Sequence, residues 1–353
     1  MTNPKLSRRR FMAIAGAGTA LTGGAAWAAQ RASAAGGGGS PGGGTSPASG
    51  QLLADTVMAA FERHRLVAIG EVAGHQEHHD ALQILLADPR LPEAADDIVV
   101  EFGNSLYQTT VDRFTSGPAV QNPDLRLIWR NTTQSPLNTW DMPVYEQFYR
   151  MVRAANWTLP QEKQIRALLG DPPIDWPKMT TKRQVQAIGA RRDSHMASVV
   201  EREVLDKGRR ALICYGANHI LHGYNAVARI ERTTGQRVYV IVAAGHPRLS
   251  SYPRRTVIAC KGTWLESADV GQFAYFPPHC GIPLGSLADA VLYLGPLTDQ
   301  THSVWNPAIY LDPIYWTELQ RRNAINGGIN LEEYRQEQPV NWQTPTGPGC
   351  PPN

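Results

Sequence analysis

The chain has 353 residues, of which 42% are hydrophobic, 8% aromatic and 18% charged. This composition supports one large or two ordinary globular domains and excludes a disordered or collagen-like chain. The formal net charge is +3, but five basic residues and no acidic residue fall within residues 1–34. The rest of the chain contains 29 basic and 31 acidic residues. This part of the chain therefore lacks the clustered positive charge that nucleic-acid binding requires.

The N-terminus has the pattern of a bacterial export signal. Ser7-Arg8-Arg9-Arg10-Phe11-Met12 matches the twin-arginine motif, and a Gly- and Ala-rich apolar stretch leads from it to Ala32-Ser33-Ala34. We expect cleavage after Ala34, passage through the twin-arginine export machinery, and a periplasmic or secreted mature protein. No run of 18 strongly apolar residues follows, so we expect no transmembrane span in the mature chain.

The composition divides the chain into four parts. Residues 1–34 form the expected signal peptide, and residues 35–50 form a Gly-rich linker that cannot bury a core. Residues 51–337 are expected to fold as a single α/β domain, in which the segment 131–176, rich in Trp and Pro, could form a cap. Residues 338–353 form a Pro-rich tail, a composition that favours extended chain.

Short apolar runs rich in β-branched residues alternate with longer helical patterns along the domain. Runs that are apolar throughout are typical of parallel strands covered on both faces. The pattern therefore predicts an α/β fold with a central, mostly parallel β-sheet flanked by helices. The expected strands are 66–70, 98–100, 125–129, 165–169, 211–215, 238–243 and 290–294, and the main expected helices are 76–86, 106–114 and 181–207.

Chemically active side chains follow several of these runs. Glu71 and His75 follow the first run, Glu101 follows the second, and Asn218-His219 follows the run at 211–215. Carboxyl ends of parallel strands meet at one edge of a sheet, so we expect Glu71, Glu101 and His219 to lie close together there. A carboxylate that ends a buried strand needs a partner. Either glutamate could instead cap the helix that follows it.

Two expectations concern the helices beside these strand ends. His78 and His79 fall in the first turns of the helix at 76–86, where we expect them to face water. In the helix at 181–207, Ile188, Arg192 and Met196 recur at four-residue steps and share one face. We expect this face to look toward the sheet, which would bring Arg192 against a buried carboxylate.

These residues resemble a known superfamily. Gly70-Glu71 with a following histidine, Val99-Val100-Glu101, Arg192-Asp193-Ser194-His195-Met196-Ala197 and Ala217-Asn218-His219-Ile220 look like motifs of the superfamily that joins erythromycin esterases, Tiki-type proteases and ChaN-like haem-uptake proteins. The resemblance covers about residues 65–295. It implies that Glu71, Glu101 and His219 lie in an active-site cleft with Arg192 reaching toward it, and that His75 is a general base or a metal ligand.

The residue types favour a hydrolase that activates water, since the chain has no Gly-x-Ser-x-Gly nucleophile motif. Without a metal, His75 would deprotonate water, Glu71 or Glu101 would orient that imidazole, and His219 or Arg192 would stabilise the oxyanion. With a metal, Glu71, His75, Glu101 and His219 would form a ligand set for zinc, manganese or iron. The sequence leaves both versions open. The substrate would be a small molecule or a peptide.

The alternative is a binding protein of the ChaN-like type that holds haem or another planar ligand without catalysis. Tryptophans between residues 129 and 176 would then offer a stacking surface, unless they belong to the core. The four cysteines permit several pairings. Cys214 is expected as a buried thiol, whereas Cys260 and Cys280 could form a disulfide in an oxidising compartment, with Cys350 as another possible partner.

Overall fold

The structure is a computed structural model and describes residues 50–137, 139–274 and 280–337. The expected signal peptide, the Gly-rich linker apart from Gly50, and the Pro-rich tail lie outside these residues. None of the helices in the described ranges is both long enough and apolar enough to cross a membrane.

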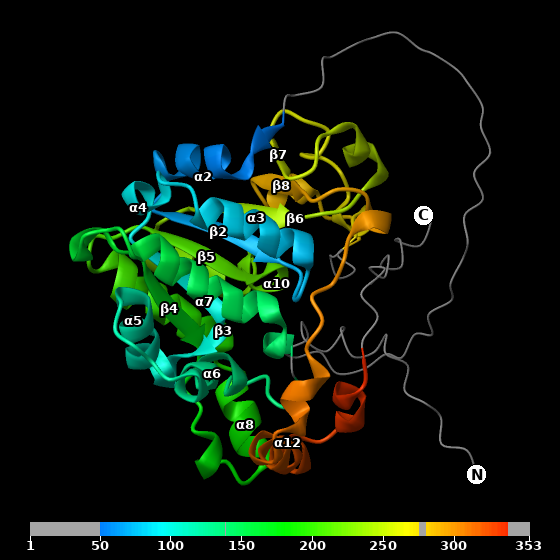
Figure 1. Ribbon diagram of the computed structural model, residues 1–353. Helices are drawn as coiled ribbons and strands as arrows, with labels where there is room; N and C mark the ends of the chain where they lie inside the picture. Colours follow the sequence, from blue (N-terminus) through cyan, green and yellow to red (C-terminus); the bar gives the residue numbers. More distant parts are fainter. Residues whose placement is uncertain (1–49, 138, 275–279, 338–353) are drawn as a thin grey trace, which may run out of the picture.

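An eight-stranded sheet runs through the described part of the chain (Figure 1). Its order is β1-β7-β8-β6-β2-β5-β3-β4. The six strands from β8 to β4 are parallel, and β7 and β1 are added antiparallel at one edge. The predicted α/β class with a mostly parallel sheet is therefore confirmed. The strands are β1 (Gln51–Leu52), β2 (Leu66–Glu71), β3 (Asp97–Asn104), β4 (Arg166–Asp171), β5 (Ala211–Gly216), β6 (Val238–Ala243), β7 (Thr256–Ala259) and β8 (Ala290–Tyr293).

Helices cover both faces of this sheet. Residues of α2, α3, α5, α6 and α7 share one buried hydrophobic cluster, and residues of α9, α10 and α11 share another. The C-terminal helix α12 adds Leu319 to the first cluster. The helices are α2 (Leu53–Phe61), α3 (Gln76–Leu86), α4 (Leu91–Ala94), α5 (Gln108–Ser116), α6 (Asn122–Arg130), α7 (Pro143–Asn156), α8 (Lys182–Gly189), α9 (Arg192–Val199), α10 (Ala217–Ile220), α11 (Asn225–Thr234) and α12 (Pro313–Asn326).

The two layers explain why the strands are apolar throughout. In β2, Val67 and Ile69 belong to one buried cluster, whereas Leu66 and Ala68 belong to the other. Successive side chains of a strand point to opposite faces, so a strand covered on both sides has no position for a solvated residue. A polar side chain is therefore accommodated where the strand ends.

The strand predicted at 125–129 is wrong, because these residues lie in helix α6. Leu125, Ile128 and Trp129 are buried at helical spacing, whereas Leu127 is exposed. A run of five apolar residues fits both the helical and the strand periodicity. Only the burial of the residues that flank the run decides between a helix and a strand. The short antiparallel strand β7 was not among the predicted strands.

The helix predicted at 181–207 is interrupted. It consists of α8, α9 and a π-helical turn at Val200–Leu205, and the break between α8 and α9 falls at Ala190 and Arg191. The segment 131–176, expected as a possible cap, contributes α7 and the edge strand β4. Its aromatic residues pack against β3, since Phe102 contacts the rings of Tyr145, Phe148 and Tyr149.

The cysteines differ from the expected bridge. Cys214 is a buried free thiol, as predicted, and Cys260 is also a buried free thiol. Cys280 is disulfide-bonded, so the pairing of Cys260 with Cys280, one of those that the sequence left open, is not formed. The physical reason is burial, because Cys260 follows β7 directly and packs into the hydrophobic cluster, whereas Cys280 is exposed.

Candidate active site

Three predicted residues converge at the carboxyl ends of the parallel strands. Glu71 ends β2 and is the register partner of Gly216, which ends β5. Glu101 lies in β3, on the other side of β5. His219 follows in α10, and its Nε2 lies 3.7 Å from Oε1 of Glu101. All three side chains are buried, so a charge on one of them acts on the others with little screening.

Glu101 is the most heavily bonded of these groups. The Gly216 backbone N–H donates to its Oε2 at 2.7 Å, and Nε2 of Gln134 donates to its Oε1 at 3.0 Å. Arg192 forms an ion pair with the same Oε1, and its Nε lies 3.6 Å from Oδ1 of Asp171. The inward orientation of Arg192 predicted from the helical pattern is therefore found.

Asp171 extends this arrangement to the next strand. It ends β4 and is almost fully buried. Thr133 donates to it twice, from the backbone N–H at 2.7 Å and from Oγ1 at 2.5 Å. Burial raises the pKa of Asp171 to about 7, although the Arg192 charge and the Thr133 bonds oppose this rise.

His219 is oriented by an acidic partner on the neighbouring helix. Its Nδ1 lies 2.6 Å from Oδ1 of Asp193, in the first turn of α9. The opposite nitrogen, Nε2, faces Glu101, and the ring remains 10% exposed. Asn225 supports the short helix α10 by donating from Nδ2 to the carbonyl of Asn218 at 2.7 Å. A carboxylate that binds Nδ1–H leaves Nε2 as the basic nitrogen, which is the arrangement of a general base.

The surroundings of Glu71 determine its protonation state. The Tyr145 hydroxyl donates to its Oε1 at 3.0 Å and receives a bond from the Gly74 N–H at 2.7 Å. Burial, with a further contribution from the charge of Glu101, raises the pKa of Glu71 to about 8. Glu71 is therefore mainly protonated at neutral pH and can donate a proton.

The histidines beside Glu71 are buried. His78 and His79, expected to face water, are 0% and 1% exposed, so that prediction is wrong. The reason is that the polar start of α3 lies under other elements: the ring of His79 packs on Tyr145, and its Nε2 lies 3.5 Å from Oε2 of Glu71. Burial lowers the pKa of His79 to about 3, which keeps its imidazole neutral.

His75 occupies a different position from the one expected. It precedes α3 as the helix-capping residue, is fully buried, and its Nε2 lies 3.9 Å from Oε2 of Glu77. Burial lowers the pKa of His75. An imidazole without solvent access in this structure is poorly suited to deprotonate a water molecule that attacks a substrate.

The expected metal set does not fit the structure. Across 50–137, 139–274 and 280–337, no group of three or more His, Cys, Asp or Glu side chains is arranged to hold a metal ion. The physical reason is that the candidate ligands have other partners. His75 lies by Glu77, Nδ1 of His219 is bound to Asp193, and Glu101 accepts from a guanidinium and two N–H groups.

Sequence reasoning missed several residues of the site. Asp171 carried a usable signal, because it follows the predicted strand at 165–169 as Glu71 follows the first run. Asp193 follows Arg192 in the sequence, but nothing in the sequence pattern indicates that it binds His219. Gln134, Thr133 and Tyr145 carry no such signal, since they enter the site from an irregular segment and from a helix. Only the folded chain shows that they reach the strand ends.

Three of the four tryptophans expected as a stacking surface belong to the core. Trp129, Trp140 and Trp176 are at most 3% exposed. Trp157, at 72% exposed, lies directly after the last residue of α7. Three of the tryptophans between residues 129 and 176 are thus not available to stack on a planar ligand.

Comparisons with known proteins support the fold. No protein-family model matches the chain, and no curated protein matches it. Among solved structures, a succinoglycan biosynthesis protein matches with a TM-score of 0.52 at 8% identity, over 68% of this chain and 90% of that one. ChaN of Campylobacter jejuni, described with cofacial haem, matches with a TM-score of 0.37 at 13% identity, over 69% of this chain and 92% of that one. The type III effector HopBA1 matches with a TM-score of 0.39 at 12% identity, over 69% and 93%. At 8% identity the likeness to the succinoglycan biosynthesis protein concerns the fold alone, and nothing is argued from the two structures with TM-scores below 0.5.

Proposed function

We propose that this chain is a hydrolase that activates a water molecule at the carboxyl ends of its central strands. The observation that carries the proposal is the pair formed by His219 and Asp193, whose basic nitrogen lies beside the ion pair of Glu101 and Arg192. The substrates we propose are carboxylic esters or amides of small molecules or peptides. In the proposed pathway the mature enzyme is exported by the twin-arginine route and acts in the periplasm or outside the cell.

The proposed roles follow from the contacts of each residue. His219 takes the proton of the attacking water through Nε2, while Asp193 holds the ring and stabilises the imidazolium that forms. The imidazolium then gives this proton to the leaving group, whereas Glu71, whose side chain has no exposed surface, stays protonated and uncharged at neutral pH. Glu101 accepts from Arg192 and lies beside Nε2 of His219, where a carboxylate favours the transient imidazolium. These roles replace His75 as the base.

A panel of p-nitrophenyl esters and peptide p-nitroanilides tests the proposal with the purified protein. We expect turnover of at least one class by wild type and its loss in His219→Gln. The matched control is His64→Gln, since His64 precedes the opposite end of β2 and contacts the ring of Tyr239. Equal turnover by both variants would contradict the role of His219.

Titration with haem tests the binding alternative in the same preparation. A Soret band at one haem per chain, together with no turnover of any ester or amide, would replace the hydrolase with a haem-binding protein of the ChaN-like type. We expect hydrolysis without a stoichiometric Soret band, because three of the four tryptophans between residues 129 and 176 lie in the core and cannot stack on the ligand.

A further inference from the structure

An irregular segment delivers two side chains to the site. This segment, residues 130–135, begins at the last residue of α6. Thr133 bonds Asp171 through its backbone N–H and its hydroxyl, and Gln134 bonds Glu101 through Nε2. The segment therefore contacts both carboxylates that face Arg192.

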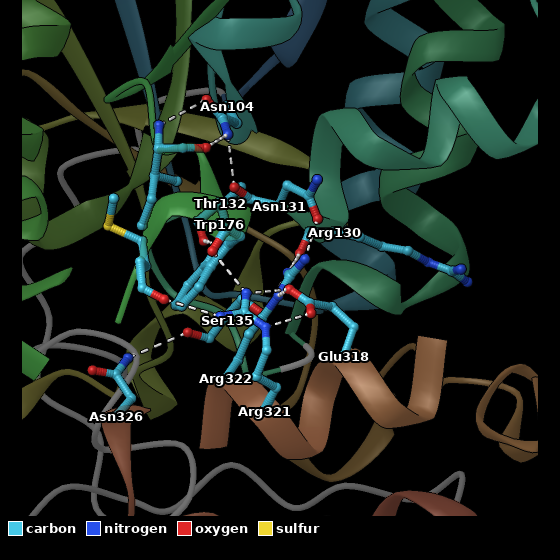
Figure 2. Close-up of polar contacts among 12 residues, drawn as sticks. Asn104, Arg130, Asn131, Thr132, Ser135, Trp176, Glu318, Arg321, Arg322 and Asn326 are labelled. Atoms are coloured by element: carbon cyan, nitrogen blue, oxygen red, sulfur yellow. Dashed lines mark hydrogen bonds and ion pairs between the residues drawn. The ribbon is translucent and has the colours of Figure 1, made fainter. Parts of the chain in front are cut away.

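The backbone of the 130–135 segment is held by side chains of other elements. Asn104, at the end of β3, donates from Nδ2 to the carbonyl of Asn131 at 2.7 Å, and Nε1 of Trp176 donates to the carbonyl of Thr132 at 3.0 Å (Figure 2). Buried carbonyls outside regular structure need such donors. The position of the segment thus depends on residues distant in the sequence.

Arg322, on the C-terminal helix α12, supplies three further bonds to the segment, one to its backbone and two to its side chains. Its Nη1 donates to the Arg130 carbonyl at 2.9 Å and to Oγ of Ser135 at 3.0 Å, and its Nη2 donates to Oδ1 of Asn131 at 2.6 Å (Figure 2). The Arg322 guanidinium is almost fully buried. It is paired with Glu318, one turn earlier, at 2.7 Å, and it lies 4.8 Å from the Trp176 ring centroid.

We propose that Arg322 is a positioning residue of the active site, acting through the 130–135 segment on Glu101 and Asp171. The proposal deepens the hydrolase function and rests on it for its kinetic consequence. A planar guanidinium can donate in several directions at once, so one side chain links the start of the segment to its end. Its loss would leave three acceptors without this donor. Thr133 and Gln134 would then no longer be held against the two carboxylates.

Hydrogen exchange of the 130–136 peptide in Arg322→Met measures the positioning directly. We expect exchange roughly tenfold faster than in wild type, because the segment loses three of its bonds to α12 and keeps only the bond from Nδ2 of Asn326 to the Ser135 carbonyl. Arg321→Met is the matched control. Arg321 also pairs with Glu318, but it donates to the carbonyls of Trp176 and Met179. We expect wild-type exchange of the 130–136 peptide in this control.

Kinetics add the second readout. In Arg322→Met we expect kcat to fall roughly tenfold with KM changed less than about threefold, whereas Arg321→Met keeps both. Unchanged exchange in Arg322→Met, or equal changes in both variants, would overturn the proposal. If wild type shows no turnover, the hydrolase function fails, while the exchange data still decide whether Arg322 positions the segment.

Arg322→Lys keeps the proposal testable if Arg322→Met does not fold. A single ammonium retains the charge beside Glu318 but cannot reproduce the planar fork. We expect the exchange rate of the 130–136 peptide in Arg322→Lys to be faster than in wild type, but slower than the roughly tenfold increase expected when all three Arg322 bonds are lost. Wild-type exchange and wild-type kcat in Arg322→Lys would overturn the positioning role.

Discussion

Gly216 and Glu101 meet at the end of β5 with no room for a side chain between them. The N–H of Gly216 donates to Oε2 of Glu101 at 2.7 Å, and a Cβ on Gly216 would lie only 2.9 Å from the same oxygen. It would also lie 3.6 Å from Cδ2 of His219. The absence of a side chain at this position lets the carboxylate approach the backbone.

Gly216→Ala should therefore damage the site more than the fold. We expect the added methyl group to displace the Glu101 carboxylate, and kcat to fall about tenfold or more. Gly189→Ala is the control, because Gly189 ends α8 and an added Cβ there would lie in open space. We expect unchanged kinetics there. Wild-type kcat in Gly216→Ala would show that the close approach is not needed.

Glu71 predicts a pH dependence of stability. The unfolded chain releases this proton near its ordinary pKa of 4.5, whereas the folded chain keeps it up to a pKa of about 8. Between these values the folded state binds more protons, so its stability falls as pH rises. Glu71→Gln cannot ionise and should not contribute to this fall.

Urea unfolding at pH 5 and pH 8 measures this effect. We expect Glu71→Gln to be similar to wild type at pH 5 and more stable at pH 8, by an amount of the order of a few kcal/mol. Glu332→Gln, at an exposed glutamate, controls for the loss of one negative charge. A stability difference from wild type that is the same at both pH values would contradict the raised pKa of Glu71.

Asp193 and His219 should behave as one unit in catalysis. We expect Asp193→Asn to lower kcat about a hundredfold, because an amide can no longer stabilise the imidazolium. The double variant with His219→Gln should lose little more than His219→Gln alone. A double-mutant cycle on kcat measures this coupling. Multiplied effects of the two substitutions would mean that the residues act independently.

The two free thiols should be protected by the fold. Burial raises the pKa of Cys260 to about 12 and raises that of Cys214 further, so both remain thiols under native conditions. We expect Cys260 to be alkylated only after the protein is unfolded. We expect Cys280 to be alkylated only after its disulfide is also reduced. Mass mapping of alkylated peptides checks this. Labelling of Cys260 in the folded protein would contradict its burial.

The sequence predicted the strand ends better than the remainder of the site. Glu71 and Glu101 follow apolar runs, and the rule that parallel strands share a carboxyl edge brings them together without further information. Arg192 could be placed because helical periodicity gives a direction. Gln134 could not, since an irregular segment has no period, and its position depends on donors such as Arg322, far along the chain. The burial of His79 was missed for a related reason, because periodicity shows which residues share a face but not what covers it.

The edge position of β1 bears on how the protein can be attached to a surface. β1 pairs only with β7 at one edge of the sheet, and four strand spacings, about 19 Å, separate it from β2. The strands that carry Glu101 and Asp171 lie farther still, toward the opposite edge. An immobilisation anchor joined directly before Gln51 would therefore hold the protein by the edge remote from the proposed site, and would leave that site oriented toward the solution.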